Sequence, residues 1–456
     1  MTKRIFLFLS IILTLVACSD NDAFTTDQGA RLTFSVDTVK LDTVFSTVGS
    51  STYSFWIYNN ASDGIRIAKA YLKQGNQTGF RVNADGTYLD NRLGSYAADL
   101  EVRKGDSIRV FVELTATENM KEEAQLVEDD LVFQLESGVE QKVHLKGVAW
   151  DAVFLRNLIV SSDSLIVSKK PVVVYGGIKV NEHATLTIKN TSLYFHGNAG
   201  MEVMGTLVTD SVLMRGDRLD HMFSYLPYDR VSGQWGGIHF GQSSTYNVMT
   251  NTELRNGSYG VKCDSSSVAP DNQRLYMEKC IVHNCKGNGL ELHNSYVGLL
   301  DCQFTNVLGD CILAYGGAVV MQNCTLAQFY PFSASRGVAL RFANGKSVAD
   351  NPKVKTYSYP LLQMRCTNTI ITGYADDELV GRQVVDSVAF DYFFENCLLR
   401  TPEVKDTIHF KNIIWEKPTD DIQGKKQFKL IDEKNYIYDF HLDSLSTAKG
   451  LGCYHE

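Results

Sequence analysis

A repeated pattern of polar, small and apolar positions runs from about residue 151 to residue 415 and predicts short strands that face a core. In each copy a small residue is followed two positions later by a large apolar residue, so that both share one strand face. The last copy has Ile413 in place of the small residue. The first of the pair is Thr191, Ser211, Thr252, Cys280, Cys302, Cys324, Thr369, Cys397 or Ile413. The second is Leu193, Leu213, Leu254, Val282, Phe304, Leu326, Ile371, Leu399 or Trp415.

A tight corner is predicted directly before each small residue. Apolar residues such as Ile188, Met249 and Phe394 lie three positions before it. A step of three flips a side chain to the other strand face, so both ends can face one core only if the chain bends between them. The residue at the bend is Asn190, Asp210, Asn251, Lys279, Asp301, Asn323, Asn368, Asn396 or Asn412. Asn and Asp tolerate the left-handed backbone conformation, so the repeat predicts strand, left-handed corner, strand.

The spacing of the copies predicts a solenoid. The small residues are separated by 20, 41, 28, 22, 22, 45, 28 and 16 residues. A period near 20 to 22 residues suits one coil per copy, with lateral insertions in the longer gaps. The Leu-x-x-Leu-x-Leu signature of leucine-rich repeats is absent, and a period of two excludes a helical solenoid.

A second pattern precedes the repeat. Ile108, Val110 and Val112 alternate with Arg109 and Phe111, which is typical of a half-buried strand. Similar short runs with turn signals between them fill the region from about Phe24 to Val148 and predict an immunoglobulin-like β-sandwich.

Both regions resemble known families. The repeat is similar to the right-handed parallel β-helices of the pectin-lyase-like superfamily, including their asparagine ladder. The runs Gly176-Gly177-Ile178-Lys179-Val180 and Gln234-Trp235-Gly236-Gly237-Ile238 resemble Gram-negative surface lipoproteins with that fold. The earlier region resembles ASH-like sandwich modules, which serve as spacers or docking platforms. The expected organisation is signal peptide (1–17), anchor and linker (18–28), sandwich (29–149), β-helix (150–416) and C-terminal tail or cap (417–456).

The first residues predict export and a lipid anchor. Lys3 and Arg4 precede an apolar run of twelve residues, Ile5–Val16, which is too short to span a bilayer. The run ends in Leu-Val-Ala-Cys, which resembles the lipobox of bacterial lipoproteins, with Cys18 as the lipidated residue. This implies attachment to the outer membrane or cell surface of a Gram-negative bacterium through Cys18. The alternative is an ordinary secretory peptide with an incidental cysteine.

Composition narrows the class of protein. The chain has 456 residues, is 44% hydrophobic and 11% aromatic, and carries a net charge of −8. The apolar content excludes wholesale disorder, and the acidic balance argues against a nucleic-acid partner. Loss of Lys3 and Arg4 with the signal peptide moves the charge to −10.

The cysteines are expected to be free thiols. Eight of the nine that follow Cys18 lie between Cys263 and Cys397, and four occupy the small position of the repeat. Stacked side chains on parallel strands point the same way, so a disulfide would distort the ladder. The run from Cys280 through His283 to Cys285 resembles a metal clip, but Cys280 faces the core, so no metal or other cofactor is expected.

Candidate binding residues come from two insertions, Arg215–Gln234 and Ala343–Pro360. Their mixture of rings and charges suits stacking against sugars. The candidates, together with the adjoining Trp235, are Tyr225, Tyr228, Asp229, Arg230, Trp235, Tyr357 and Tyr359. The competing and favoured interpretation is that these loop aromatics simply pack.

Binding or scaffolding is the favoured function, with a glycan or an envelope protein as partner. The Asn-Thr-Asp and Gly-His-Gly elements of hydrolases with this fold are absent. The outward residues that follow the small position include Val212, Glu253, Gln303 and Leu398, and they form no acidic or basic ladder of the kind lyases need. The alternative is a polysaccharide lyase or glycoside hydrolase with a divergent site.

The lipid anchor predicts a simple labelling result. Substitution Cys18→Ala removes the only thiol at the cleavage site and should abolish incorporation of radioactive fatty acid into the protein. Continued labelling of the variant in cells would contradict the assignment.

Overall fold

The computed structural model describes residues 23–89, 96–269, 272–350 and 353–455, so Cys18 and the expected signal peptide lie outside the described residues. The chain divides into two units, Met1–Asp151 and Ala152–Glu456. Helical structure in the described ranges is limited to two short 3-10 turns, η2 (Tyr228–Arg230) and η3 (Gly424–Gln427). No helix in these ranges is long and apolar enough to cross a membrane.

The first unit is a sandwich of two five-stranded sheets, as the sequence predicts. One sheet has the order β1 (Thr33–Phe34), β3 (Tyr53–Tyr58), β8 (Ser107–Leu114), β5 (Phe80–Ala84), β6 (Thr87–Tyr88). The other has the order β2 (Thr38–Phe45), β10 (Glu140–Trp150), β9 (Gln125–Leu135), β4 (Ile65–Leu72), β7 (Tyr96–Val102). Ile108, Val110 and Val112 are buried between the sheets while Arg109 and Phe111 face solvent, which confirms the alternation.

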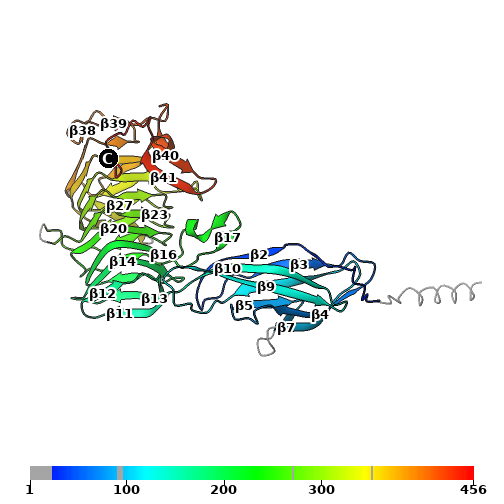
Figure 1. The fold of residues 1–456 in the computed structure, drawn as a ribbon. Coiled ribbons are helices and arrows are strands. Elements are labelled where there is room, and N and C mark those ends of the chain that lie inside the picture. The colour runs from blue at the N-terminus through cyan, green and yellow to red at the C-terminus, as the bar shows by residue number, and fades with distance from the viewer. Residues whose placement is uncertain (1–22, 90–95, 270–271, 351–352, 456) are drawn as a thin grey trace, which may run out of the picture. The chain divides into compact units, whose positions relative to one another are not determined.

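The second unit is a parallel β-helix whose coils each contribute to three sheets (Figure 1). Sheet I precedes the corner and contains β12 (Ser164–Val167), the first halves of β14 (Thr185–Phe195), β16 (Thr206–Gly216) and β20 (Asn247–Arg255), then β22 (Leu275–Glu278), β25 (Tyr296–Leu300), β28 (Gly317–Gln322), β33 (Leu361–Thr367), β36 (Phe390–Glu395) and β38 (Phe410–Lys411).

Sheet II follows the corner and sheet III closes the coil. Sheet II contains the first halves of β11 (Val153–Val160) and β13 (Val172–Val180), the second halves of β14, β16 and β20, then β23 (Ile281–His283), β26 (Gln303–Thr305), β29 (Thr325–Gln328), β34 (Ile370–Gly373), β37 (Leu398–Leu399) and β39 (Ile414–Trp415). Sheet III contains the second halves of β11 and β13, then β15 (Met201–Val203), β19 (Ile238–Phe240), β21 (Val261–Cys263), β24 (Leu290–His293), β27 (Ile312–Tyr315), β30 (Leu340–Ala343) and β35 (Leu379–Arg382).

The corner between sheets I and II is left-handed, as predicted. Positive φ angles between 46° and 55° occur at Asn190, Asn251, Lys279, Asp301, Asn323, Asn368, Asn396 and Asn412. The corner amides also bond from coil to coil, because Asn323 Nδ2 donates to Asp301 Oδ1 at 2.9 Å and Asn368 Nδ2 donates to Asn323 Oδ1 at 3.1 Å. On these coils polar side chains therefore tie the corner to the corner of the coil before it.

The register predicted for one copy of the repeat is wrong. The left-handed residue of that coil is Ser211 (φ 58°), not Asp210, so the inward positions are Val212 and Met214 instead of Ser211 and Leu213. The pairing of Thr191 with Val212 fixes this alignment. Burial decides it, since Val212 and Met214 can both enter the core only if Ser211 takes the corner.

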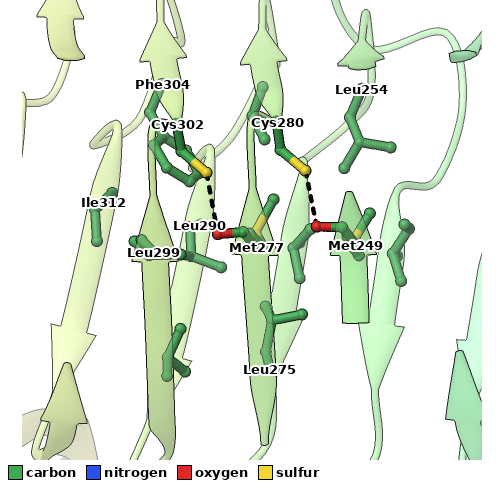
Figure 2. Close-up of a cluster of buried hydrophobic side chains, with 14 of the residues drawn as sticks. Met249, Leu254, Leu275, Met277, Cys280, Leu290, Leu299, Cys302, Phe304 and Ile312 are labelled. Atoms are coloured by element: carbon green, nitrogen blue, oxygen red, sulfur yellow. Dashed lines mark hydrogen bonds between the residues drawn. The ribbon is translucent and has the colours of Figure 1, made fainter. Parts of the chain in front are cut away.

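In most copies the small position of the repeat carries a side chain that can donate a hydrogen bond. Cys280 Sγ donates to the Met249 carbonyl at 3.2 Å and Cys302 Sγ to the Met277 carbonyl at 3.4 Å, in each case on the preceding coil (Figure 2). Thr191, by comparison, donates its hydroxyl to the Lys189 carbonyl at 2.7 Å. All nine described cysteines are free, and eight are buried, which confirms the expected thiols.

Two hairpins and a C-terminal segment decorate the coils. The insertions carry β17 (His221–Phe223) with β18 (Leu226–Pro227), and β31 (Gly345–Asp350) with β32 (Lys353–Ser358). The C-terminal segment, residues 417–455, contains η3 and the hairpin β40 (Phe428–Asp432) and β41 (Ile437–Leu442), which lies beside the coils in Figure 1.

The C-terminal segment covers apolar residues on the outside of sheet II. The cluster that results contains Ala327, Phe329, Ile370 and Leu398 from the coils, and Phe428, Phe440, Ala448 and Leu451 from the segment. A buried ion pair secures its start, since Arg400 Nη1 lies 3.3 Å from Glu416 Oε2. Glu416 Oε1 accepts hydrogen bonds from Gly424 N and Gln427 Nε2, so its charge is fully paired.

The corner ladder predicts a difference between two substitutions of Asn368. Asn368→Gly removes two amide bonds but keeps the left-handed backbone, whereas Asn368→Ala adds a strain of about 1–2 kcal/mol. Alanine should therefore lower the free energy of unfolding by about 1–2 kcal/mol more than glycine, as measured by urea denaturation. Equal losses for the two variants would contradict a strained corner.

Candidate functional site

Parallel stacking aligns two rows of outward side chains on sheet II. Leu213 pairs with Glu253, Glu253 with Ile281, and Ile281 with Gln303. Two positions further along each strand, Arg255 pairs with His283 and His283 with Thr305. Neighbouring strands lie about 4.8 Å apart, so residues 20 to 50 apart in the sequence become direct neighbours. The polar part of this face forms the floor of a groove.

The groove lies between the floor of sheet II and the C-terminal segment. It consists of two adjoining hollows of about 340 and 300 Å³ that share Ile281, Gln303, His441 and Tyr454. The first hollow is otherwise lined by Lys279, Asp301, Cys453 and His455, and the second by Arg230, Glu253, Arg255, His283, Tyr438, Asp439 and Phe440. Strand β41 and the residues around Tyr454 form one wall, and Arg230 of η2 contributes at the opposite end.

A chain of hydrogen bonds holds the floor and the wall together. Tyr454 Oη donates to Gln303 Oε1 at 3.1 Å, and Gln303 Nε2 donates to Thr305 Oγ1 at 2.9 Å. Thr305 Oγ1 lies 2.8 Å from His283 Nδ1, which extends the chain by one more coil. The Tyr454 ring also stacks on His441, with the ring centroids 4.0 Å apart. The aromatic wall is therefore fixed in position over the floor.

The groove contains both neutral and charged groups near pH 7. Burial, together with the charges of Arg230 and Arg255, lowers the pKa of His283 to about 3, so this imidazole is neutral. Burial raises the pKa of Tyr454 to about 12. Burial alone would raise the pKa of Asp439, but hydrogen bonds from the His441 backbone and imidazole lower it overall, so this carboxylate is ionised. His441 Nδ1 lies 2.6 Å from Asp439 Oδ1.

Asp229 lies next to the groove, but its carboxylate is already paired with two arginines. Its Oδ1 lies 2.6 Å from Arg215 Nη1 and 3.2 Å from Arg255 Nε. The Arg215 side chain is only 8% exposed, and burial lowers its pKa in spite of the Asp229 charge. Asp229 therefore holds the insertion onto sheet II and orients Arg255 in the groove floor.

The other predicted residues of the first insertion have different surroundings. Arg230 lines the groove as a binding residue would. Tyr228 lies under the Arg218 guanidinium, 4.0 Å from ring centroid to Cζ. Tyr225 is 67% exposed and stacks on Phe223, and it does not line the groove.

Trp235, Tyr357 and Tyr359 do not come together with Arg230. Trp235 is 1% exposed, stacks on Phe195 at 4.5 Å and donates its indole N–H to the Arg255 carbonyl, so its ring is inaccessible to a ligand. The expectation of ligand contact at Trp235 is corrected on this ground. Tyr357 belongs to β32 opposite Lys346, and Tyr359 meets His293 of sheet III edge-on, so neither lines the groove.

Several groove residues were missed in the sequence. Arg255, His283 and Thr305 lie three positions after the small residue of the repeat, beyond the positions that the repeat pattern covers. The wrong register at Ser211 also moves Arg215 out of this row. The sequence pattern predicts no site residue between Tyr438 and His441. A run of Tyr-Asp-Phe-His is a signal in itself, because it combines rings with titratable groups.

The suggested metal clip does not form in the described ranges, where no three His, Cys, Asp or Glu side chains lie close enough to hold a metal ion. Cys280 and Cys285 are buried in the coil, whereas His283 points outward to Tyr438 and Phe440. The two thiols and the imidazole therefore belong to different faces of one strand and its turn.

Comparison of the sequence with protein families gives one match, to the family described as the right handed beta helix region, over residues 143–326. The predicted right-handed parallel β-helix is thus confirmed by the family match and the observed sheets. No curated protein matches the sequence significantly.

Solved structures of low similarity accompany this match. The catalytic domain of a GH87 alpha-1,3-glucanase in complex with nigerose has 10% identity and a TM-score of 0.29, with 77% of this chain and 82% of that chain covered. The Yersinia enterocolitica family 28 exopolygalacturonase has 9% identity and a TM-score of 0.17, with 84% and 86% covered. The ASH / PapD-like domain 7 of human CEP192 has 10% identity and a TM-score of 0.18, with 30% and 96% covered.

The arginine pair around Asp229 predicts a loss of stability when its charge is removed. Asp229→Asn leaves Arg215 and Arg255 together without their shared counter-charge, which should lower the free energy of unfolding by about 1–3 kcal/mol. The matched control is Glu202→Gln, because Lys179 and Glu202 form an exposed pair that contributes about 0–1 kcal/mol. Similar thermal midpoints for the two variants would contradict a buried role for Asp229.

Proposed function

We propose that this parallel β-helix protein binds an extended glycan chain in the groove between sheet II and the C-terminal segment. The observation that supports this most directly is the composition of the groove, a polar floor of Glu253, Arg255 and Gln303 facing the rings of Tyr438 and Tyr454. Flat rings pack against the apolar faces of sugars, while guanidinium, carboxylate and amide groups bond to hydroxyls.

The shape of the groove favours a chain over a compact ligand. Glu253, Ile281 and Gln303 belong to three successive coils, which lie about 4.8 Å apart, so this part of the floor alone extends for roughly 10 Å. The two hollows continue one another through shared residues instead of forming one deep pocket. An open slot of this kind accommodates several sugar units in line.

The place of action is a further part of this proposal. The lipobox-like sequence at Cys18 would anchor the chain to the outer membrane or cell surface, where glycans and envelope proteins are within reach. Binding and scaffolding at the envelope then require no chemistry from the groove.

Cleavage of a glycan is a second candidate because of one pair of residues. Asp439 holds Nδ1 of His441, and this arrangement orients an imidazole for proton transfer through its other nitrogen. His441 stands at the point where the two hollows meet. A hydrolase or lyase would use such a group as acid or base.

Glycan binding by the detergent-solubilised full chain tests the proposal. A panel of neutral and acidic oligosaccharides would be titrated by calorimetry, and Tyr454→Ala should weaken binding about tenfold or more, because stacking and the bond to Gln303 are lost together. The control is Tyr225→Ala, the same change at an exposed ring outside the groove, which should leave the affinity unchanged.

The same samples separate binding from cleavage. New reducing ends, or the absorbance of an unsaturated uronate, would establish turnover and favour the enzyme, and His441→Gln should then abolish it. A panel with no binder, or equal losses for Tyr454→Ala and Tyr225→Ala, would reject the groove as the glycan site.

A further inference from the structure

A second open hollow lies on sheet III, away from the groove. Its volume is about 470 Å³, which falls within the range of about 300–1,000 Å³ typical of small-molecule sites. None of the described residues that line it also lines the groove. It is called the sheet III hollow here, and the outward side chains that line it come from four successive coils, namely Ile159, Lys179, Glu202 and His239.

The hollow exists because the turns between sheets II and III are rich in glycine on these coils. Gly177 has a φ angle of 95°, and a Cβ atom on it would lie 2.8 Å from the Gly200 carbonyl oxygen of the next coil. Gly237 has a φ angle of 92°, and a Cβ atom on it would lie 2.8 Å from Cδ2 of Tyr259. Both positions therefore require glycine, and the bare backbone of these turns forms the floor of the hollow.

The outward row of sheet III supplies polar groups of both charges. Lys179 Nζ lies 3.9 Å from Glu202 Oε2, and their side chains are 50% and 53% exposed, so a ligand can reach both. His239 Nε2 lies 3.0 Å from Asp264 Oδ2, which places a carboxylate beside the imidazole. Because Lys179 and Glu202 carry opposite formal charges, this part of the hollow is balanced and suits an uncharged ligand.

Tyr259 lies at the last coil of the hollow and supplies a ring and a hydroxyl. Its ring packs against the backbone of Gly237 and is partly buried. Burial, together with the charges of Asp264, Glu291 and Glu202, raises the pKa of the hydroxyl, so the phenol remains protonated and can donate a hydrogen bond. A ring beside ammonium, carboxylate and imidazole groups can pack on a sugar face and bond to sugar hydroxyls.

The shape of the hollow favours an extended ligand. Ile159, Lys179, Glu202 and His239 pair in this order on strands about 4.8 Å apart, so the row is roughly 14 Å long. A chain that runs along the solenoid axis can meet all four side chains. The row points outward from sheet III, whereas the groove floor points outward from sheet II, so the two sites can be occupied at the same time.

We infer that the sheet III hollow binds a second, uncharged glycan chain, and that one protein molecule bridges two chains. The bridging rests on the proposed function, because the groove supplies the other site. A molecule with sites on two sheets joins chains into a network, which a molecule with one site cannot do. This gives the scaffolding role a specific form, the cross-linking of glycans.

Binding of uncharged oligosaccharides by the full chain tests the second site. Hexasaccharides of glucose, mannose, xylose and N-acetylglucosamine would be titrated by calorimetry. Binding of at least one of them should weaken about tenfold or more in Tyr259→Ala and in the double variant Lys179→Ala with Glu202→Ala, because the ring or the polar pair is lost. Tyr454→Ala should leave this binding unchanged, since Tyr454 belongs to the groove.

The double variant has a matched control. Lys411 and Glu395 form an exposed pair at 2.6 Å on sheet I, outside both sites, and Lys411→Ala with Glu395→Ala also removes one charge of each sign. This control should bind as the wild type does. The double variant alters only exposed side chains, so it tests the hollow even where Tyr259→Ala fails to fold.

Bridging is measured with two kinds of labelled particle, on protein that light scattering shows to be monomeric. One kind carries the hexasaccharide that binds the sheet III hollow, and the other carries the oligosaccharide that binds the groove. The wild type should bring the two labels together. Tyr259→Ala and Tyr454→Ala should each abolish this joining, although each variant retains one of the two glycans.

The outcomes separate the two sites. Hexasaccharide binding that is missing in the wild type, equal in wild type and the double variant, or equally weakened in the control overturns the sheet III hollow as a site and leaves the groove untouched. Hollow binding without any glycan in the groove refutes the proposed function and the bridging but retains the second site. Binding at both sites without joining of the particles overturns the bridging alone.

Discussion

Registration of each coil on the coil before it is the constraint on which the rest of this β-helix depends. Backbone pairing alone would not define the corner between sheets I and II. At this corner the inward-facing positions change from one face of the strand to the other. The left-handed residues at the corner, the amide ladder through Asn323 and Asn368, and the thiols of Cys280 and Cys302 bonding to the preceding coil all act at this one point. They fix which side chains face inward and which face outward.

The groove follows from that registration. Arg255, His283 and Thr305 are far apart in the sequence, yet they form a continuous row because their coils stack in parallel without slippage. The row lies under the edge of the C-terminal segment, where Tyr438 and Phe440 pack against His283. Ile370 and Leu398 of later coils are fully covered by the same segment. The site is therefore located where the polar part of sheet II meets the edge of its cover.

The local part of the fold was predictable from the sequence, and the long-range part was not. Asn396 at a corner and Cys302 in the core follow from conformational preference and strand periodicity within a few residues. Local conformational preference allows either Asp210 or Ser211 at the left-handed corner. Only the burial of Val212 and Met214 decides that Ser211 takes it. Tyr454 reaches Gln303 over 151 residues, and nothing local in either residue indicates that contact. The prediction for Trp235 is wrong because an aromatic residue beside an insertion has the same local sequence pattern whether its ring is buried or exposed.

The hairpin β40–β41 pairs only with itself among the described strands, and its attachment to the coils relies on side chains such as Phe428 and Phe440. Substitutions in the floor and in the wall of the groove are consequently subject to different structural constraints. A change in Glu253 or Gln303 must respect the stacking of neighbouring coils, whereas a new turn or a new ring in the hairpin leaves the solenoid intact. Under the proposed function, exchange of the hairpin is the simplest change that would alter the ligand preference, much as antibodies vary loops on a constant framework.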